Sequence, residues 1–266
     1  MSEILILGAT GKTGRRLVRR LQAAGEKVRP ASRSSQVRFD WNDPGTWDET
    51  SRGAHAVYLV APDSPGPVHE FVARAADVRK YVVLSGRGAD KLDADFSRSM
   101  LDAEEAARNS GAEWTVLRPN NFNQNFDEFV WRDGVMAGLL QLPLGKTPEP
   151  FVDVEDIAEV AAEVLTGDGH AGRTYELSGP RGVTFEEAVA IIGRASGRAI
   201  RYEEVTPEAY RKQLAAEGWG PEDADGVLAM FAYMSGGHVA EPADGVRQVL
   251  GREATSFEEY ARRVWS

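Results

Sequence analysis

The sequence predicts an α/β protein: a Rossmann-like parallel sheet flanked by helices, followed by a small, mostly helical C-terminal part that covers a substrate. Two observations predict the sheet. An apolar strand at the start of the chain runs directly into a glycine-rich turn, and strands alternate with helices through the N-terminal half. A continuous apolar strand is typical of a parallel sheet buried on both faces, and the alternation is typical of βαβ units. The C-terminal third has fewer strands and longer helices, which predicts the covering part.

The first strand, expected at 4–7, is followed by the segment GATGKTG. Its glycines have the spacing that allows a tight turn, leaves room for a pyrophosphate and lets the next helix, expected at 15–24, pack against the strand. The N–H groups at the start of that helix then face an anion. An ordinary βα turn is the alternative, and Lys12 is explained equally well as a surface charge. We assign to a cofactor Gly8, Thr10, Gly11, Lys12, Thr13 and Gly14.

The end of the second strand, expected at 27–33, bears on the choice between NAD(H) and NADP(H). An NAD site places an acidic residue here for the ribose 2′-hydroxyl, yet no Asp or Glu occurs between Val28 and Val37. Ser32 and Arg33 stand there instead, and a guanidinium pairs well with a 2′-phosphate. The sequence therefore predicts NADP(H), with a surface loop charge as the alternative for Arg33.

A short third strand at 36–40 ends in Asp40 and Trp41. We expect Asp40 to accept a hydrogen bond from the adenine amino group and Trp41 to cover the base. The fourth strand, at 55–60, ends at the sheet edge where open α/β sheets bind ligands, before a Pro/Gly-rich loop at 63–67. The residues assigned to the cofactor at that edge are Val60, Ala61 and Pro62.

The sixth strand, expected at 113–117, leads into RPNNFNQN, which has five amides within six residues. Amides donate and accept hydrogen bonds without charge, which suits a neutral ligand. A turn-rich helix entry is the alternative, because Asn is common in turns. We assign Ser85, after the fifth strand at 80–84, and Asn120 to the cofactor, and assign to the substrate Asn121, Phe122 and Asn125.

The following segment, 126–144, is predicted to be a helix, with Trp131 in a pocket wall. Asp156 is expected to cap a helix at 157–165, after a short strand at 151–154. His238 follows a helix at 221–234 in the flexible segment SGGH, and it is the candidate acid and a candidate substrate contact. Further helices are expected at 43–47, 68–76, 97–110, 184–195, 206–216 and from 256, the fourth and sixth with capping boxes, and further strands at 173–177 and 200–205.

Residues 1–150 are expected to form the nucleotide-binding domain and residues 151–266 the smaller covering part, with the strand at 173–178 returning to the sheet. The net charge of −10 argues against nucleic acid and anionic membranes as partners and leaves a small molecule. The chain has no cysteine, and its four histidines are widely spaced, so no metal site is predicted. No leader and no long apolar run are visible, so a cytoplasmic location is expected.

Six ordered blocks resemble one family: GATGKTG at 8–14, VRPASR at 28–33, YVVLSG at 81–86, SGAEWTVLRPNNFNQN at 110–125, FVDVEDIAEVAAEVL at 151–165 and YELSGPRGVTFEEA at 175–188. The chain is similar over nearly its whole length to the NmrA-like, atypical short-chain dehydrogenase/reductase family. That resemblance implies a Rossmann-like domain that binds NADP(H) and a small C-terminal domain that closes over the substrate. The shorter block FDWNDPGTW at 39–47 resembles the branch that includes the fungal ergot-alkaloid iminium reductases.

The chain departs from the parent family where that family carries a catalytic Tyr/Lys pair. The matching positions hold Met100 and Glu104, which are assigned to the substrate instead, and Ser85 matches the catalytic serine. The expected function is an NADPH-dependent reductase whose acceptor needs no such pair: an iminium, an activated C=C bond or a quinone. An acidic wall for a cationic iminium would come from Asp127, Glu128 or Glu104. The alternative is a non-catalytic redox sensor that binds NADP(H) and a partner.

Overall fold

The strand β1 (Glu3–Leu7) illustrates how the sequence builds the sheet. Its side chains alternate between two cores: Ile4 and Ile6 pack on one face, Leu5 and Leu7 on the other, and all four are buried. A strand that is buried on both faces requires helices on both sides of the sheet. The computed structural model describes residues 3–62, 65–92 and 95–266. The expected loop at 63–67 therefore lies partly outside the described residues.

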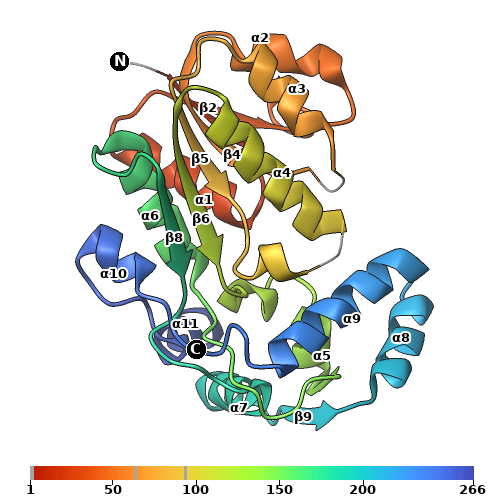
Figure 1. Cartoon of the computed structure of the whole chain (residues 1–266). Coiled ribbons are helices and arrows are strands. Elements are labelled where there is room, and N and C mark those ends of the chain that lie inside the picture. Colours follow the sequence, from red (N-terminus) through yellow and green to blue (C-terminus); the bar gives the residue numbers. More distant parts are fainter. Residues whose placement is uncertain (1–2, 63–64, 93–94) are drawn as a thin grey trace.

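In the described part of the chain, seven strands form one sheet in the order β3-β2-β1-β4-β5-β6-β8, and every pairing is parallel. The predicted fold class is confirmed (Figure 1). The order reverses between β1 and β4, and open α/β sheets bind ligands outside the carboxyl ends of the strands at such a point. The other six strands are β2 (Val28–Ser32), β3 (Val37–Arg38), β4 (Ala54–Val60), β5 (Lys80–Leu84), β6 (Glu113–Pro119) and β8 (Arg173–Leu177).

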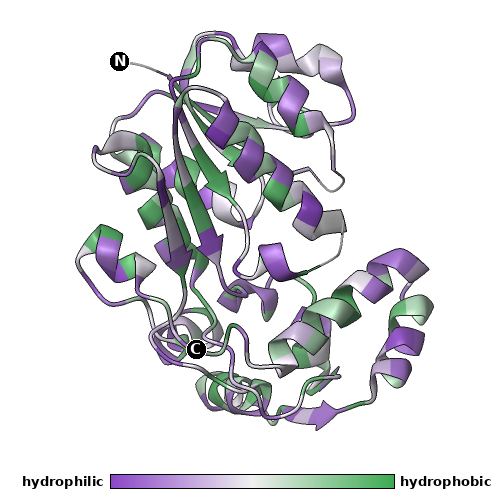
Figure 2. Ribbon diagram, viewed as in Figure 1, coloured by the Kyte–Doolittle hydropathy of each residue, from purple (hydrophilic) through white to green (hydrophobic). Residues whose placement is uncertain are grey.

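Helices cover both faces of this sheet. Helices α1 (Lys12–Ala23) and α6 (Val154–Thr166) pack with Ile4 and Ile6 on one face, and α3 (Pro67–Arg74) and α4 (Asp95–Asn109) cover the other. In Figure 2 the central strands of the sheet are largely green, while the helices mix purple and green, as expected for elements with one face in water. Two short helices, α2 (Trp47–Ser51) and α10 (Gly245–Leu250), complete the layers.

A separate core holds the C-terminal part together. Aromatic rings of Phe126, Trp131, Phe151 and Phe185 interlock, with Trp131 and Phe185 4.7 Å apart between ring centroids. No helix in the described residues has the length and apolar character needed to cross a membrane. The elements around this core are α5 (Arg132–Ala137), β7 (Leu139–Leu142), α7 (Phe185–Ser196), β9 (Arg201–Glu204), α8 (Pro207–Ala216), α9 (Pro221–Ser235) and α11 (Phe257–Trp265), and capping boxes open α7 and α11 as predicted.

The prediction of one helix over 126–144 is wrong. The α-helix in this segment is the short α5, and Gly138, in the left-handed conformation with φ +82°, ends it. The next four residues form β7, whose side chains alternate between half-buried and buried. β7 pairs in parallel with β9, and this pairing with a distant segment overrides the apolar helical pattern of the sequence.

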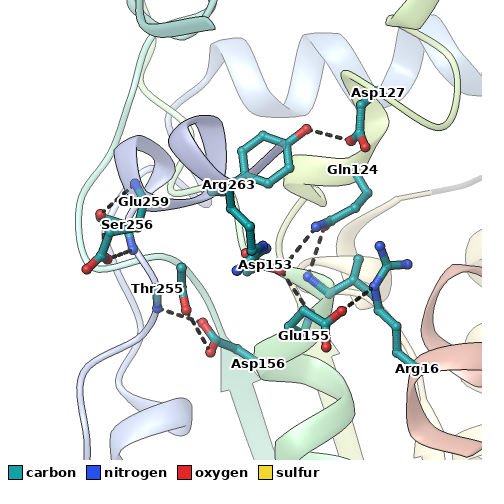
Figure 3. Close-up of polar contacts among 12 residues, drawn as sticks. Arg16, Gln124, Asp127, Asp153, Glu155, Asp156, Thr255, Ser256, Glu259 and Arg263 are labelled. Atoms are coloured by element: carbon teal, nitrogen blue, oxygen red, sulfur yellow. Dashed lines mark hydrogen bonds and ion pairs between the residues drawn. The ribbon is translucent and has the colours of Figure 1, made fainter. Parts of the chain in front are cut away.

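The predicted cap of α6 is also wrong, because Asp153 and not Asp156 opens the helix. Asp153 accepts hydrogen bonds from the Glu155 N–H at 2.9 Å and from Gln124 at 3.0 Å (Figure 3). Buried Asp156 instead accepts from the Thr255 N–H at 2.6 Å. The expected strand at 151–154 is reduced to an isolated bridge between Phe122 and Val152. These contacts fix the amide-rich segment after β6 against α6.

Candidate functional site

The glycine-rich turn has the geometry of an anion site. Gly8 ends β1 with φ +66°, and a Cβ on Gly14 would lie 2.2 Å from the carbonyl oxygen of Gly8, so α1 packs directly on the turn. Gly11 is the residue before α1. No side chain caps the start of α1, and the first turn of this helix has no acidic residue. The first N–H groups and the positive end of the helix dipole are therefore available to an anion. The turn fits the pyrophosphate of a dinucleotide.

Lys12 connects this turn to the amide-rich segment. Its Nζ donates a hydrogen bond to Asn125 Oδ1 at 2.7 Å and lies 4.0 Å from the centroid of the Phe129 ring. Burial lowers the pKa of Lys12 to about 8. The ammonium is thus half-buried between α1 and the loop after β6 and is not a fully solvated surface charge. Thr13 beside it is buried, whereas Thr10 is exposed.

The loop after β2 carries the residues assigned to a 2′-phosphate. Ser32 is buried, its hydroxyl lies 2.7 Å from the Ser35 hydroxyl, and it accepts a hydrogen bond from the Ser34 N–H at 3.2 Å. Arg33 is exposed and forms no ion pair or hydrogen bond within the described ranges. The loop therefore offers hydroxyls and a cation at the carboxyl end of β2. The pairing of Arg33 with a 2′-phosphate stays a prediction.

The residues assigned to the adenine lie beside a cluster of aromatic side chains. Trp41 is half-buried and packs edge-on against Phe39 and Phe71, with ring centroids 4.8 and 5.4 Å apart. Asp40 accepts a hydrogen bond from the Asn42 N–H at 3.0 Å. On the other side of β1, a Cβ on Gly8 would lie 3.5 Å from Val60, the residue before Ala61 and Pro62. Adenine contacts by Asp40 and Trp41 stay predictions.

A cavity of about 270 Å³ opens at the carboxyl ends of β5 and β6. One side of it is apolar and is formed by α4, α9 and the loop between β5 and α4, through Leu92, Met100, Met230, Tyr233 and Met234. The polar part of the wall comes largely from the amide-rich segment, and Asn121 also contacts Met234 at 3.4 Å. The predicted site residues that meet in its wall are Lys12, Ser85, Met100, Asn120, Asn121, Phe122 and Asn125.

The polar side of the cavity is organised by Glu149, which sequence reasoning missed. Its side chain is 1% exposed, and its Oε1 accepts hydrogen bonds from Asn120 Nδ2 at 2.9 Å, the Asn121 N–H at 3.1 Å and Asn121 Nδ2 at 3.3 Å. Burial raises the pKa of this carboxyl group. Asn120 also accepts a hydrogen bond from Arg87 at 3.1 Å, so Asn120 links the Arg87 guanidinium to Glu149.

Ser85 and Glu104 form a second polar pair. Ser85 donates a hydrogen bond of 2.6 Å to Glu104, and Arg118 binds both oxygens of that carboxylate at 2.8 and 2.7 Å. Arg118 and Ser85 hold the pKa of Glu104 below its ordinary value despite its burial. Glu104 does not line the cavity, and its charge is neutralised by Arg118, so the structure does not support its assignment to the substrate.

Two further residues assigned to the substrate do not line the cavity. Trp131 is 1% exposed within the aromatic core and does not line the cavity, because the helix predicted to present it does not form. His238 is exposed and stacks on Tyr233, with ring centroids 4.7 Å apart, and only its neighbour Val239 reaches the cavity. The role of His238 as an acid stays a prediction.

Asp127 and Glu128, which were expected to form an acidic wall for a cationic substrate, do not line the described cavity. Asp127 accepts a hydrogen bond from the Tyr260 hydroxyl at 2.5 Å (Figure 3). Glu128 pairs with Arg16 at 2.7 Å and with Arg15. Both carboxylates are thus committed to structural contacts, and neither lines the cavity.

The residues that the sequence did not reveal reach the cavity from distant segments. Met230, Tyr233 and Met234 share one face of α9, a helix whose richness in Met, Tyr and Phe was visible but did not indicate where it packs. Glu149 stands between two prolines in TPEPF, a context without a catalytic signal. A Cβ on Gly88 would lie 2.5 Å from the Tyr233 ring, so α9 packs closely on the loop after β5.

Comparisons with known proteins agree with this architecture. The chain is 35% identical to (4-alkanoyl-5-oxo-2,5-dihydrofuran-3-yl)methyl phosphate reductase of Streptomyces griseus subsp. griseus, over 97% of this chain and 96% of the relative. It is 27% identical to agroclavine dehydrogenase of Claviceps fusiformis, over 98% of each chain. The triphenylmethane reductase of a Citrobacter species, crystallised with NADP(H), superposes with a TM-score of 0.79 at 21% identity, covering 99% of this chain and 100% of that one.

The first of these relatives is similar enough over its whole length to establish a common family, and the structural likeness independently supports the fold. A family model also matches residues 72–261, which include the cavity wall from Ser85 to Val239. The resemblance seen in the six sequence blocks is therefore confirmed. The chain belongs to the NmrA-like family.

Proposed function

We propose that this protein is an NADPH-dependent reductase that transfers a hydride to a small organic acceptor without a Tyr/Lys pair. The observation that carries the proposal is the cavity beside the glycine-rich turn, at the carboxyl ends of β5 and β6. A regulatory protein that only reads the cofactor has no need of a built substrate cavity. Relatives named as a reductase and a dehydrogenase support the same reaction class.

The residues present fit NADP(H) along the carboxyl ends of the strands. The turn at Gly8–Gly14 suits the pyrophosphate, and Lys12 lies at its edge as a cation. Ser32 and Arg33, without an acidic residue nearby in the sequence, suit the 2′-phosphate. NADPH supplies a hydride when bound. The protein's part is to bind the cofactor, hold the acceptor and exclude water.

The cavity sets limits on the acceptor. About 270 Å³ suits a small molecule of one or two rings, and the methionine-rich side favours an apolar body. Asn121 and Asn125 add polar groups to the wall of the same cavity. An iminium, an activated C=C bond and a quinone all meet these limits.

The test is a titration with NADPH and with NADH, followed by quenching of tryptophan fluorescence, and then an assay of NADPH oxidation. A cyclic enone, a small quinone and a cyclic iminium serve as acceptors. Tighter binding of NADPH than of NADH, with turnover of at least one acceptor, supports the reductase. Tight binding of NADP(H) with no turnover of any acceptor would instead indicate the redox-sensor alternative.

A further inference from the structure

The geometry points to Glu149 as the proton donor to the carbonyl oxygen of the acceptor, and so to a conjugated carbonyl compound, an enone or a quinone, as the substrate class. This inference rests on the proposed reductase function and goes beyond it, because a reductase of the kind proposed needs no acid for an iminium. The argument starts from where Glu149 lies. It is in the cavity wall and is 1% exposed.

The two oxygens of Glu149 have different surroundings. Oε1 accepts all three hydrogen bonds, from Asn120 and twice from Asn121. Oε2 accepts none from the described part of the chain. Because the three donors occupy Oε1, a proton on this carboxyl group belongs on Oε2. Oε2 is then the group left to face a ligand.

The backbone holds this arrangement rigidly. The Glu149 N–H donates to the Val183 carbonyl at 3.0 Å, and the Val183 N–H donates back to the Glu149 carbonyl at 3.0 Å. Asn120 is tied to β8 through its N–H, which donates to the Leu177 carbonyl at 2.8 Å, and its amide also donates to the Val239 carbonyl at 3.1 Å. A group held so firmly can deliver a proton without reorganising the site.

The charged and titratable groups that face Glu149 are few. Arg87 acts through Asn120 and favours the carboxylate, but its guanidinium also binds Glu176 at 2.9 Å, which offsets part of its charge. Lys12 and Tyr233 line the same cavity. Burial opposes the charged form most strongly and raises the pKa of Glu149. The hydrogen bonds from Asn120 and Asn121 also favour the carboxylate, and burial outweighs them.

The reaction balances with Glu149 as the acid. An enone that gains a hydride at its β-carbon forms a C–H bond there. The electron pair of the C=C bond becomes a new double bond between the α-carbon and the carbonyl carbon, and the π pair of the C=O bond moves onto the oxygen, so that protonation of the oxygen gives an enol, which tautomerises to the saturated ketone. Glu149 gives the proton of its Oε2–H to that oxygen, forming an O–H bond and leaving a carboxylate. Water reprotonates the carboxylate through the open cavity. A quinone that follows the same two steps gives the keto tautomer of the hydroquinone, which becomes the hydroquinone when the added ring carbon loses a proton to water and the second oxygen gains one; the hydride supplies the two electrons.

The experiment compares wild type with Glu149→Gln, which keeps an oxygen for the three donors but has no acidic proton. Glu186→Gln, at an exposed position on α7, is the matched control. The first readout needs no turnover: the infrared spectrum of the free protein at neutral pH. A carboxylic acid C=O band present in wild type and Glu186→Gln but missing from Glu149→Gln is expected. Absence of that band in wild type overturns the inference.

The second readout is turnover of a cyclic enone with NADPH. Glu149→Gln is expected to be about 10²- to 10⁴-fold slower in kcat/KM than wild type. Wild-type kcat/KM falls as pH rises through the pKa of Glu149, and this limb vanishes in Glu149→Gln. NADPH binding, followed by fluorescence, stays unchanged and shows that the variant is folded.

The outcomes separate the two proposals. A Glu149→Gln protein that keeps wild-type turnover, or that is slower with an unchanged pH limb, overturns the role of Glu149 and leaves the reductase standing. A wild type that turns over only the cyclic iminium overturns the substrate class. A wild type that turns over no acceptor overturns the proposed function itself.

Discussion

Ser85 donates a hydrogen bond of 2.6 Å to Glu104, and the sequence predicts that both match catalytic positions of the parent family. Glu104 is fully buried and receives two more hydrogen bonds from Arg118. The pair therefore fixes the end of β5 against α4 and β6. A group that was expected to touch the substrate has become part of the support of the cavity.

Replacing Glu104 by alanine is expected to destabilise the protein by about 3 kcal/mol, because the substitution leaves Arg118 and Ser85 without their acceptor. Arg118 retains some exposure, which places the loss at the lower end of the usual range for a broken buried pair. Urea denaturation followed by circular dichroism measures the effect. Glu105→Ala, on the exposed side of the same helix, should change stability by less than about 0.5 kcal/mol.

The same carboxylate gives a pH dependence. The pKa of Glu104 is lowered in the folded protein from its ordinary value of 4.5, so its contribution to stability is present above 4.5 and is lost as pH falls through the folded value. The difference in free energy of unfolding between wild type and Glu104→Gln should therefore shrink below pH 4.5. A difference that grows in acid would contradict the ion pair.

Alanine at Gly14 and at Gly11 should separate folding from binding. The methyl group at position 14 meets the Gly8 carbonyl oxygen at 2.2 Å, a backbone contact that cannot move cheaply, and about 3 kcal/mol of stability should be lost. At position 11 the same distance is 3.1 Å, and the loss should be about 1 kcal/mol. Gly11→Ala should nevertheless weaken NADPH binding, because its methyl group occupies the space for the pyrophosphate. Equal destabilisation by the two substitutions would contradict this geometry.

Arg33→Ala should weaken NADPH binding about tenfold and leave NADH binding unchanged, since a charged hydrogen bond to an exposed 2′-phosphate contributes about 1.5 kcal/mol. The preference of wild type should decrease at high salt. Arg79→Ala, before the amino end of β5, is the control cation because it lies at the other edge of the sheet. Fluorescence titration measures both cofactors, and a parallel loss of NADPH and NADH binding would argue against the 2′-phosphate contact.

Lys12 should take up a proton when NADPH binds near pH 8. Its pKa of about 8 leaves about half of the free protein with a neutral amine, and the phosphates of the cofactor favour the ammonium. Calorimetry at pH 8 in two buffers of different ionisation enthalpy should show uptake of up to about half a proton. Lys12→Arg stays charged and should show none. Equal uptake by the two proteins would assign the proton to another group.

The sequence alone determined the parts of the fold that depend on local patterns. Apolar strands such as Ile4–Leu7 predict a sheet buried on both faces, and the spacing of Gly8, Gly11 and Gly14 predicts the turn and the helix packed on it. The capping boxes at Thr184 and Ser256 fixed two helix starts, because each is complete within four residues. Sequence also predicted that amides from the segment after β6 would line a site.

The tertiary structure decided the features that depend on pairing between distant segments. The apolar run at 126–144 became a short helix and a strand because β9 pairs with Leu139–Leu142, and the aromatic core captured Trp131. Only the folded chain places Glu149 beside Asn120 and Asn121. Only the folded chain also brings the methionines of α9 into the wall of the same cavity. Hydrophobic periodicity predicts which face of a helix or strand is buried, but it does not predict which other element packs against that face. The residues joined by side-chain hydrogen bonds in the wall of this cavity lie 28 to 152 residues apart along the chain, and a local sequence pattern does not predict contacts over such separations.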